Sequence, residues 1–155
     1  MTDSTHTPKA LKSLETLLHQ DIPLTQSMGL QVMEATADSL RLRAPLQNNI
    51  NHKSTAFGGS LYATAVLTGW GLIHLALTEH DLHGHIVIQE SHTRFLKPVK
   101  ADIETRCRFE SEPQLATFLK TYHRKGRARI QLTTEIYNEA QELATVFEGQ
   151  YVVHR

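Results

Sequence analysis

The longest pattern in this chain is an apolar stretch without formal charge between Lys53 and Glu79. Its apolar side chains would cover every side of a helix: Leu61, Ala63, Ala65, Val66, Leu67, Trp70, Leu72, Ile73, Leu75 and Leu77. A helix that is apolar all round must be surrounded by lipid or by protein. Glycines, threonines and His74 interrupt the stretch, and Lys or Arg does not flank it asymmetrically, which favours protein. The pattern therefore predicts a buried helix that begins at Gly58.

Alternation of apolar and polar residues predicts strands on both sides of this helix, and richness in β-branched residues predicts the strand over 85–96. The clearest case is 101–110, where Ala101, Ile103, Thr105, Cys107 and Phe109 share one face and charged residues occupy the other. The six predicted strands are 30–34, 39–44, 85–96, 101–110, 127–138 and 143–154.

Helical spacing predicts two further helices. One covers 8–20, and a short one lies between the Ser111-Glu112-Pro113 cap and Gly126, while residues 1–7 are expected to be frayed. The strands come in pairs with hairpin-length links, which predicts an antiparallel sheet with helices on one face. The chain is thus expected to form a single α+β domain over 1–155, with the sheet curled around the long helix.

Composition narrows the classes of partner and compartment. Lys and Arg together number sixteen, as do Asp and Glu, so no excess charge favours nucleic acid or an anionic membrane. The polar N-terminus is not followed by an apolar segment like that of a signal peptide. A single cysteine, Cys107, excludes an internal disulfide. We therefore expect a cytoplasmic protein without a nucleic-acid or membrane partner.

The segment that opens the long helix is the strongest candidate for chemistry. A polar loop from Asn51 to Phe57 leads into the pair Gly58-Gly59. The first amides of a helix have no partner within it and carry partial positive charge, so this start suits an anion or a polarised carbonyl. Asn51 is placed to orient a water. The alternatives are that the glycines only allow close packing and that Asn51 only forms a turn.

These residues resemble the signature of hotdog-fold acyl-CoA thioesterases, in which Asn is followed, after a five-residue gap, by His-Gly-Gly. Asn51 stands at the Asn position and Phe57-Gly58-Gly59 at His-Gly-Gly. Further matches to the family are Arg94-Phe95-Leu96-Lys97-Pro98, Gly126-Arg127 and Ala144-Thr145-Val146-Phe147-Glu148-Gly149. The resemblance covers 28–154 and is closest to the putative-thioesterase domain appended to some bacterial GNAT acetyltransferases.

The resemblance implies a hotdog fold, an acyl-CoA or acyl-carrier thioester as substrate, and a homodimer or a dimer of dimers. No cofactor is implied, since coenzyme A is part of the substrate. One departure is important: the family's catalytic Asp or Glu lies nine residues after the His, where this chain has Val66. Valine cannot act as a base. A non-catalytic acyl-CoA or acyl-carrier binding module is therefore the second hypothesis, and a hotdog hydratase is a third.

Other side chains provide candidates for the remaining roles. Glu90 and His92 lie on one face of a predicted strand and can form a general-base pair, or else an outward polar strip. Thr64 and Thr68 share a helix face and can contact substrate or bond to the preceding turn.

The predicted substrate-binding residues also include Phe57, at the family's His position, together with Arg94 and Lys97 for the phosphates of coenzyme A. The group His80, Asp81, His83 and His85 fits no defined metal motif, so no metal is expected.

Overall fold

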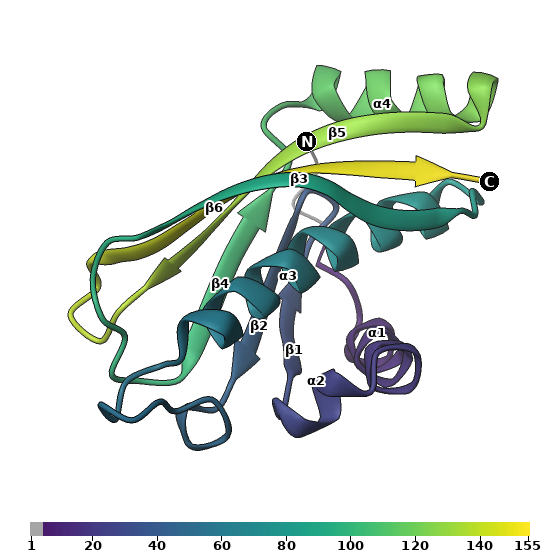
Figure 1. Cartoon of the computed structure of the whole chain (residues 1–155). Coiled ribbons are helices and arrows are strands. Elements are labelled where there is room, and N and C mark those ends of the chain that lie inside the picture. The colour runs from purple at the N-terminus through teal and green to yellow at the C-terminus, as the bar shows by residue number, and fades with distance from the viewer. Residues whose placement is uncertain (1–4) are drawn as a thin grey trace.

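The computed structural model describes residues 5–155 and shows an α+β domain with one antiparallel sheet and a long helix, α3, lying across it (Figure 1). The helices are α1 (Pro8–Asp21), α2 (Leu24–Ser27), α3 (Gly58–Glu79) and α4 (Glu112–Lys125), with a 3-10 turn at Leu46–Asn48. The strands are β1 (Gln31–Ala35), β2 (Ser39–Ala44), β3 (His85–Phe95), β4 (Ile103–Arg108), β5 (Arg127–Tyr137) and β6 (Leu143–His154). The predicted fold class is confirmed.

The order of strands in the sheet, β1-β2-β4-β5-β6-β3, differs from simple hairpin pairing. The predicted pairs β1–β2 and β5–β6 form. The pair β3–β4 does not, because β4 lies between β2 and β5 while β3 pairs with β6 at the edge of the sheet. The prediction of a hairpin from the short link 97–100 was therefore wrong.

Local signals at the helix ends are present as predicted. Ser111 Oγ accepts a hydrogen bond from the Gln114 amide, and Gly126 ends α4 in the left-handed region at φ 70°. Near the N-terminus, residues 1–4 lie outside the described part. The other residues expected to be frayed have partners: the His6 amide donates to the Ala35 carbonyl, and Thr7 caps α1.

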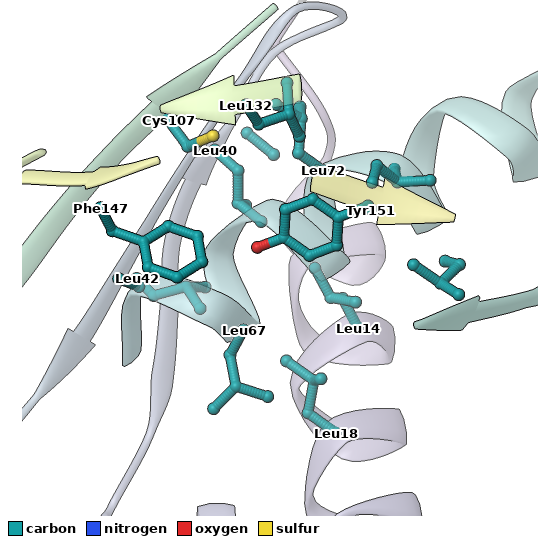
Figure 2. Close-up of a cluster of buried hydrophobic side chains, with 14 of the residues drawn as sticks. Leu14, Leu18, Leu40, Leu42, Leu67, Leu72, Cys107, Leu132, Phe147 and Tyr151 are labelled. Carbon is teal, nitrogen blue, oxygen red and sulfur yellow. The ribbon is translucent and has the colours of Figure 1, made fainter. Parts of the chain in front are cut away.

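The core lies between α3 and the inner face of the sheet. Figure 2 shows leucines of α1, β2 and α3 meeting Phe147 and Tyr151 of β6. Each of Leu14, Leu18, Leu40, Leu42 and Leu72 is buried. The Tyr151 hydroxyl donates to the Val66 carbonyl (2.8 Å), and the burial of this phenol raises its pKa. Burial of these leucine and aromatic side chains away from water is the main stabilising contribution to the fold.

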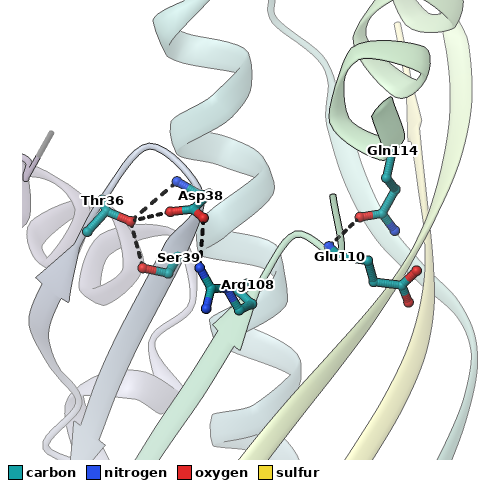
Figure 3. Close-up of polar contacts among 6 residues, drawn as sticks. All are labelled: Thr36, Asp38, Ser39, Arg108, Glu110 and Gln114. Atoms are coloured by element: carbon teal, nitrogen blue, oxygen red, sulfur yellow. Dashed lines mark hydrogen bonds and ion pairs between the residues drawn. The ribbon is translucent and has the colours of Figure 1, made fainter. Parts of the chain in front are cut away.

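A second set of polar contacts joins the β1–β2 turn to β4 (Figure 3). Thr36 donates to one carboxylate oxygen of Asp38 (2.8 Å) and Arg108 to the other (3.0 Å). Burial alone would raise the pKa of Asp38, but these two hydrogen bonds keep it below its usual range. Gln114 accepts from the Glu110 amide (2.8 Å) and so fixes the start of α4 beside the end of β4.

The sheet does not enclose α3 completely. Gly59 and Tyr62 are exposed, and Val66, Trp70 and His74 are half-buried, so one stripe along the helix is uncovered. The expectation of a helix covered on all sides is corrected in this respect. By length and hydropathy alone, α3 could cross a membrane, a test that core helices of soluble proteins also meet. In this structure, 61% of the most apolar part of α3 is buried within the protein.

Candidate active site

The N-terminus of α3 presents two free backbone donors. Phe57 precedes the helix in an extended conformation (φ −64°, ψ 134°), and its side chain gives no cap. The Ser60 and Leu61 amides both donate to the Phe57 carbonyl. Within residues 5–155 the amides of Gly58 and Gly59 have no acceptor. These amides, at the positive end of a 22-residue helix, form an arrangement that can bind a negatively charged or polarised oxygen.

A buried asparagine that the sequence analysis missed fixes the loop before this helix. The Asn49 side chain donates to the carbonyls of Met28 (2.9 Å) and Pro45 (2.8 Å), and the backbone carbonyl of Asn49 accepts from the Phe57 amide (2.7 Å). The Ala56 amide donates to Val99 across the domain. Contacts with Met28, with the segment 45–49 and with Val99 therefore determine where α3 begins. No local pattern distinguishes Asn49 from its neighbour Asn48.

Two exposed aromatic rings flank the free amides. A Cβ added at Gly58 would lie 3.7 Å from the ring of Phe95, and one added at Gly59 would clash with the ring of Phe57. Phe57 and Phe95 are 56% and 55% exposed, an unusual amount for phenylalanine, and Leu96 beside them is also exposed. Polar donors inside an apolar rim suit a ligand that has a carbonyl joined to an apolar chain.

Asn51 lies in the same loop, but its side chain is engaged within the loop. Its Oδ1 accepts from the amides of Lys53 (2.8 Å) and Thr55 (3.1 Å), and its Nδ2 donates to the Thr55 hydroxyl (2.9 Å). This geometry is that of a turn-forming asparagine. Its role in orienting water remains a prediction.

Thr64 and Thr68 are fully buried and are bonded within the fold. Thr64 donates to the Ser60 carbonyl (2.6 Å) and Thr68 to the Thr64 carbonyl (2.7 Å). The Thr68 hydroxyl also contacts that of Thr105 on β4 (2.7 Å). The first two bonds lie within α3, and only the Thr68–Thr105 bond joins the helix to the sheet, so both hydroxyls already have partners.

A β-bulge between Ile88 and Glu90 decides which side chains of β3 face the helix. Beyond the bulge Thr93 pairs with Phe147, whose ring packs against Tyr62 of α3 at 5.6 Å. Paired residues share a face of the sheet, and alternate residues face opposite sides, so His92 and Glu90 point away from α3.

The structure therefore does not bring Glu90 and His92 to the Gly58 amides of the same chain. Arg94 lies on the same outer face and is exposed. Lys97 follows β3 and forms an ion pair with Glu142, which lowers the pKa of that carboxyl.

The inner side of β3 carries hydroxyl groups instead. Ser91 Oγ and the Tyr62 hydroxyl are 2.9 Å apart. Tyr62 lies on α3, one helical turn after Gly58. Tyr62 is followed one turn later by Val66, on the uncovered stripe of α3.

Residues 5–155 contain no group of three or more side chains able to hold a metal ion. Burial raises the pKa of Cys107 to about 12, so this thiol stays protonated at neutral pH and is unsuited to nucleophilic attack.

Comparison with known proteins identifies a sequence family and several similar structures. The sequence model of the YiiD_C family, described as "Putative thioesterase (yiiD_Cterm)", matches residues 11–155. A crystal structure of a protein of unknown function from Chlorobaculum tepidum is similar at 36% identity, with 95% of each chain covered and a TM-score of 0.90. A protein from Shewanella oneidensis described as a putative thioesterase is 29% identical, with 96% of this chain and 100% of that chain covered and a TM-score of 0.86.

A more distant similarity concerns the fold alone. A Pseudomonas aeruginosa protein of unknown function, described as a probable thioesterase, shares 20% identity over 99% of both chains with a TM-score of 0.77. The architecture of α3 and its sheet is that of the hotdog-fold thioesterases.

Proposed function

This chain belongs to the YiiD_C family of putative thioesterases, and we propose that it hydrolyses the thioester of an acyl-CoA or of an acyl group on a carrier protein. The observation that carries the proposal is the pair of unpartnered amides of Gly58 and Gly59 at the start of α3. Water oxygen adds to the thioester carbonyl carbon, the carbon–sulfur bond breaks, and a proton from the water ends on the departing sulfur. The products are a carboxylic acid and a thiol.

The free amides support the step in which the carbonyl oxygen gains negative charge. Donors aimed at that oxygen lower the barrier, and removal of one such donor costs about 3–4 kcal/mol in well-studied enzymes. The exposed rings of Phe57 and Phe95 give the acyl chain an apolar surface beside these donors. Arg94 and Lys97 are the candidates for the phosphates of coenzyme A, and no cofactor is needed.

A dimer is part of the same proposal. Strand β3 has eleven residues and, within residues 5–155, pairs with no strand other than β6, so its other edge can pair with a second copy. The uncovered stripe of α3 adjoins this edge, since Tyr62 contacts Ser91. We propose that two copies meet here, as a dimer or a dimer of dimers, in the cytoplasm. Light scattering at assay concentration tests this, and a monomer would contradict it.

The decisive assay follows thiol release from acyl-CoAs of several chain lengths with purified, folded protein. Release of free coenzyme A well above the uncatalysed rate supports hydrolysis. No release from any acyl-CoA or acyl-carrier thioester would remove the enzymatic proposal.

Val66 favours one competing function, a module that binds acyl thioesters without hydrolysing them, because this position provides no carboxylate. Calorimetry distinguishes the two: heat of binding without product formation supports the module. Absence of both binding and turnover would contradict both functions.

A further inference from the structure

A cavity of about 680 Å³ lies where the start of β3, the end of β6 and the last turn of α4 meet, at the end of the sheet marked C in Figure 1. Its ionisable lining residues are all basic: Lys125, Arg127, His154 and Arg155. Val87 and Val152 give it an apolar floor, and Val87 is 46% exposed. Cavities of about 300–1,000 Å³ that combine apolar walls with a few polar groups are typical small-molecule sites. We call this one the basic cavity.

The register of the sheet shows that the floor of the basic cavity is the face turned away from α3. Three core residues pair across β3, β6 and β5: Ile86, Val153 and Ala128. Successive residues of a strand point to opposite faces, so the neighbours Val87, His154 and Arg127 lie on the outer face. The cavity is therefore separate from the core and open to solvent.

Three basic side chains cross this face in one row. Arg127 lies directly opposite His154, which lies directly opposite His85, and the two imidazole rings are 5.4 Å apart. Within residues 5–155 no Asp or Glu forms an ion pair with any of the three, nor with Lys125 or Arg155. Like charges directly opposite each other destabilise a sheet. The described part of the chain supplies no negative charge to this row, so an anion bound from outside would stabilise it.

The end of α4 accounts for only part of this basic group. Positive charge is favourable in the last turn of a helix, which explains Lys125. Arg155 Nη2 donates to the His123 carbonyl (3.1 Å), and a Cβ added at Gly126 would lie 2.9 Å from Nη1, so its guanidinium is held against the helix end. Arg127 belongs to β5 and has neither role. A ligand is the simplest reason for its position.

We propose that the basic cavity binds a phosphate ester that carries a flat organic group, as a nucleotide does. The planar guanidinium of Arg127 donates two hydrogen bonds to phosphate oxygens, and Lys125 adds a second positive charge. The organic group lies on the floor formed by Val87 and Val152. Because Arg155 is already held in place, less freedom is lost when the anion binds.

This cavity lies far from the candidate active site of the same chain. Strand β3 runs for eleven residues from His85, in the basic row, to Phe95 beside Gly58, a span of about 33 Å. Two sources carry the ligand chemistry: a free nucleotide and the nucleotide end of coenzyme A. The second source requires the proposed dimer, since antiparallel pairing of two β3 edges brings His85 of one copy toward Phe95 of the other.

Calorimetric titration of the folded protein with ADP tests the site without any thioester present. We expect one ADP to bind per chain. Arg127→Gln and Lys125→Gln should each weaken this binding by about tenfold or more, because each removes a charged hydrogen-bond donor from the cavity. Lys120→Gln is the matched control: it makes the same change at an exposed position of α4 outside the cavity, and the affinity should stay within about twofold.

The proposal is overturned if neither ADP nor coenzyme A binds to folded protein, or if Arg127→Gln and Lys125→Gln bind ADP as tightly as the natural protein does. It is also overturned if inorganic phosphate binds as tightly as ADP, because the apolar floor then takes no part. Thermal unfolding of each variant shows that a loss of binding is not a loss of fold.

Rates of thiol release distinguish the two sources. If ADP raises the apparent KM for acyl-CoA and Arg127→Gln removes this inhibition, the cavity holds the nucleotide end of the substrate. If ADP binds and KM is unchanged, the cavity holds a free nucleotide. A protein that binds ADP in this cavity but hydrolyses no thioester would contradict the proposed function and leave the present inference standing.

Discussion

Replacing Gly58 with proline removes one proposed donor and leaves the helix intact. Gly58 is the first residue of α3, a position that favours proline, because the fixed φ of proline suits it and its amide has no partner within the helix. The residue before a proline must be extended, and Phe57 already is, at φ −64° and ψ 134°. A Cβ at this position makes only an ordinary contact with Phe95, at 3.7 Å.

The expected effect on catalysis is large, whereas the expected effect on stability is small. A substitution of glycine by proline at a compatible site stabilises a fold by about 0.4–1 kcal/mol, since the unfolded chain loses freedom. Loss of one oxyanion donor reduces kcat by about 10²–10³-fold, or roughly 3–4 kcal/mol in the barrier. An unchanged or higher melting temperature together with a much lower kcat would therefore locate the defect in the transition state.

The matched control is Gly58→Ala, which adds a Cβ but keeps the amide. Initial rates of thiol release over a range of acyl-CoA concentrations give kcat and KM for both variants, and thermal unfolding gives their stability. We expect the alanine variant to remain within about threefold of the natural kcat, since no donor is lost. If the proline variant matches the alanine variant in kcat, the Gly58 amide does not contact the reacting carbonyl and the oxyanion site must be placed elsewhere.

Three further predictions concern the helix and its surroundings. Val66→Glu introduces a carboxylate on the uncovered stripe of α3 and should raise kcat by about tenfold or more. The pH–rate profile should then show a new fall in rate on the acid side. Val66→Gln adds no base, so it should change neither kcat nor the profile. Gly69→Ala would overlap the Tyr151 hydroxyl in the core and should lower the free energy of unfolding by about 1–3 kcal/mol in urea titrations, so a loss below about 0.5 kcal/mol would contradict the packing described here. A hydrogen bond from the Leu46 amide lowers the pKa of Asp102 in the folded protein. The ionised carboxylate therefore stabilises the fold at any pH above the pKa of the unfolded chain, about 3.9. This stabilisation is lost as the pH falls through the lower pKa of the folded protein. Melting temperatures from pH 7 to pH 3 should therefore fall less steeply below about pH 4 for Asp102→Asn than for the natural protein, and parallel curves would contradict this.

Much of the fold was predictable because its signals are local. Capping residues lie within one turn of α1 and α4, as Ser111 and Gly126 show for α4, whereas the short helix α2 has no such side-chain cap and was not predicted. The helix over 58–79 followed from the apolar stretch, and its free amides were expected because the first amides of a helix have no partner within it. Strands such as 101–110 followed from alternation, which reports burial on one face, and 85–96 followed from its β-branched residues. The likeness to a domain appended to acetyltransferases remains a prediction.

What the sequence could not determine depends on pairing between distant residues. The bulge at Ile88–Glu90 forms only against β6, and it reverses which later side chains of β3 face α3. Glu90 and His92 therefore point outward, while Thr93, which no local pattern marks, faces the helix near Phe95. A one-residue change of register exchanges the two faces of a strand, and that register is set by partners some sixty residues away. The β-branched residues of 85–96 thus predicted that β3 is a strand, and only the packed sheet decided which of its side chains reach the candidate site.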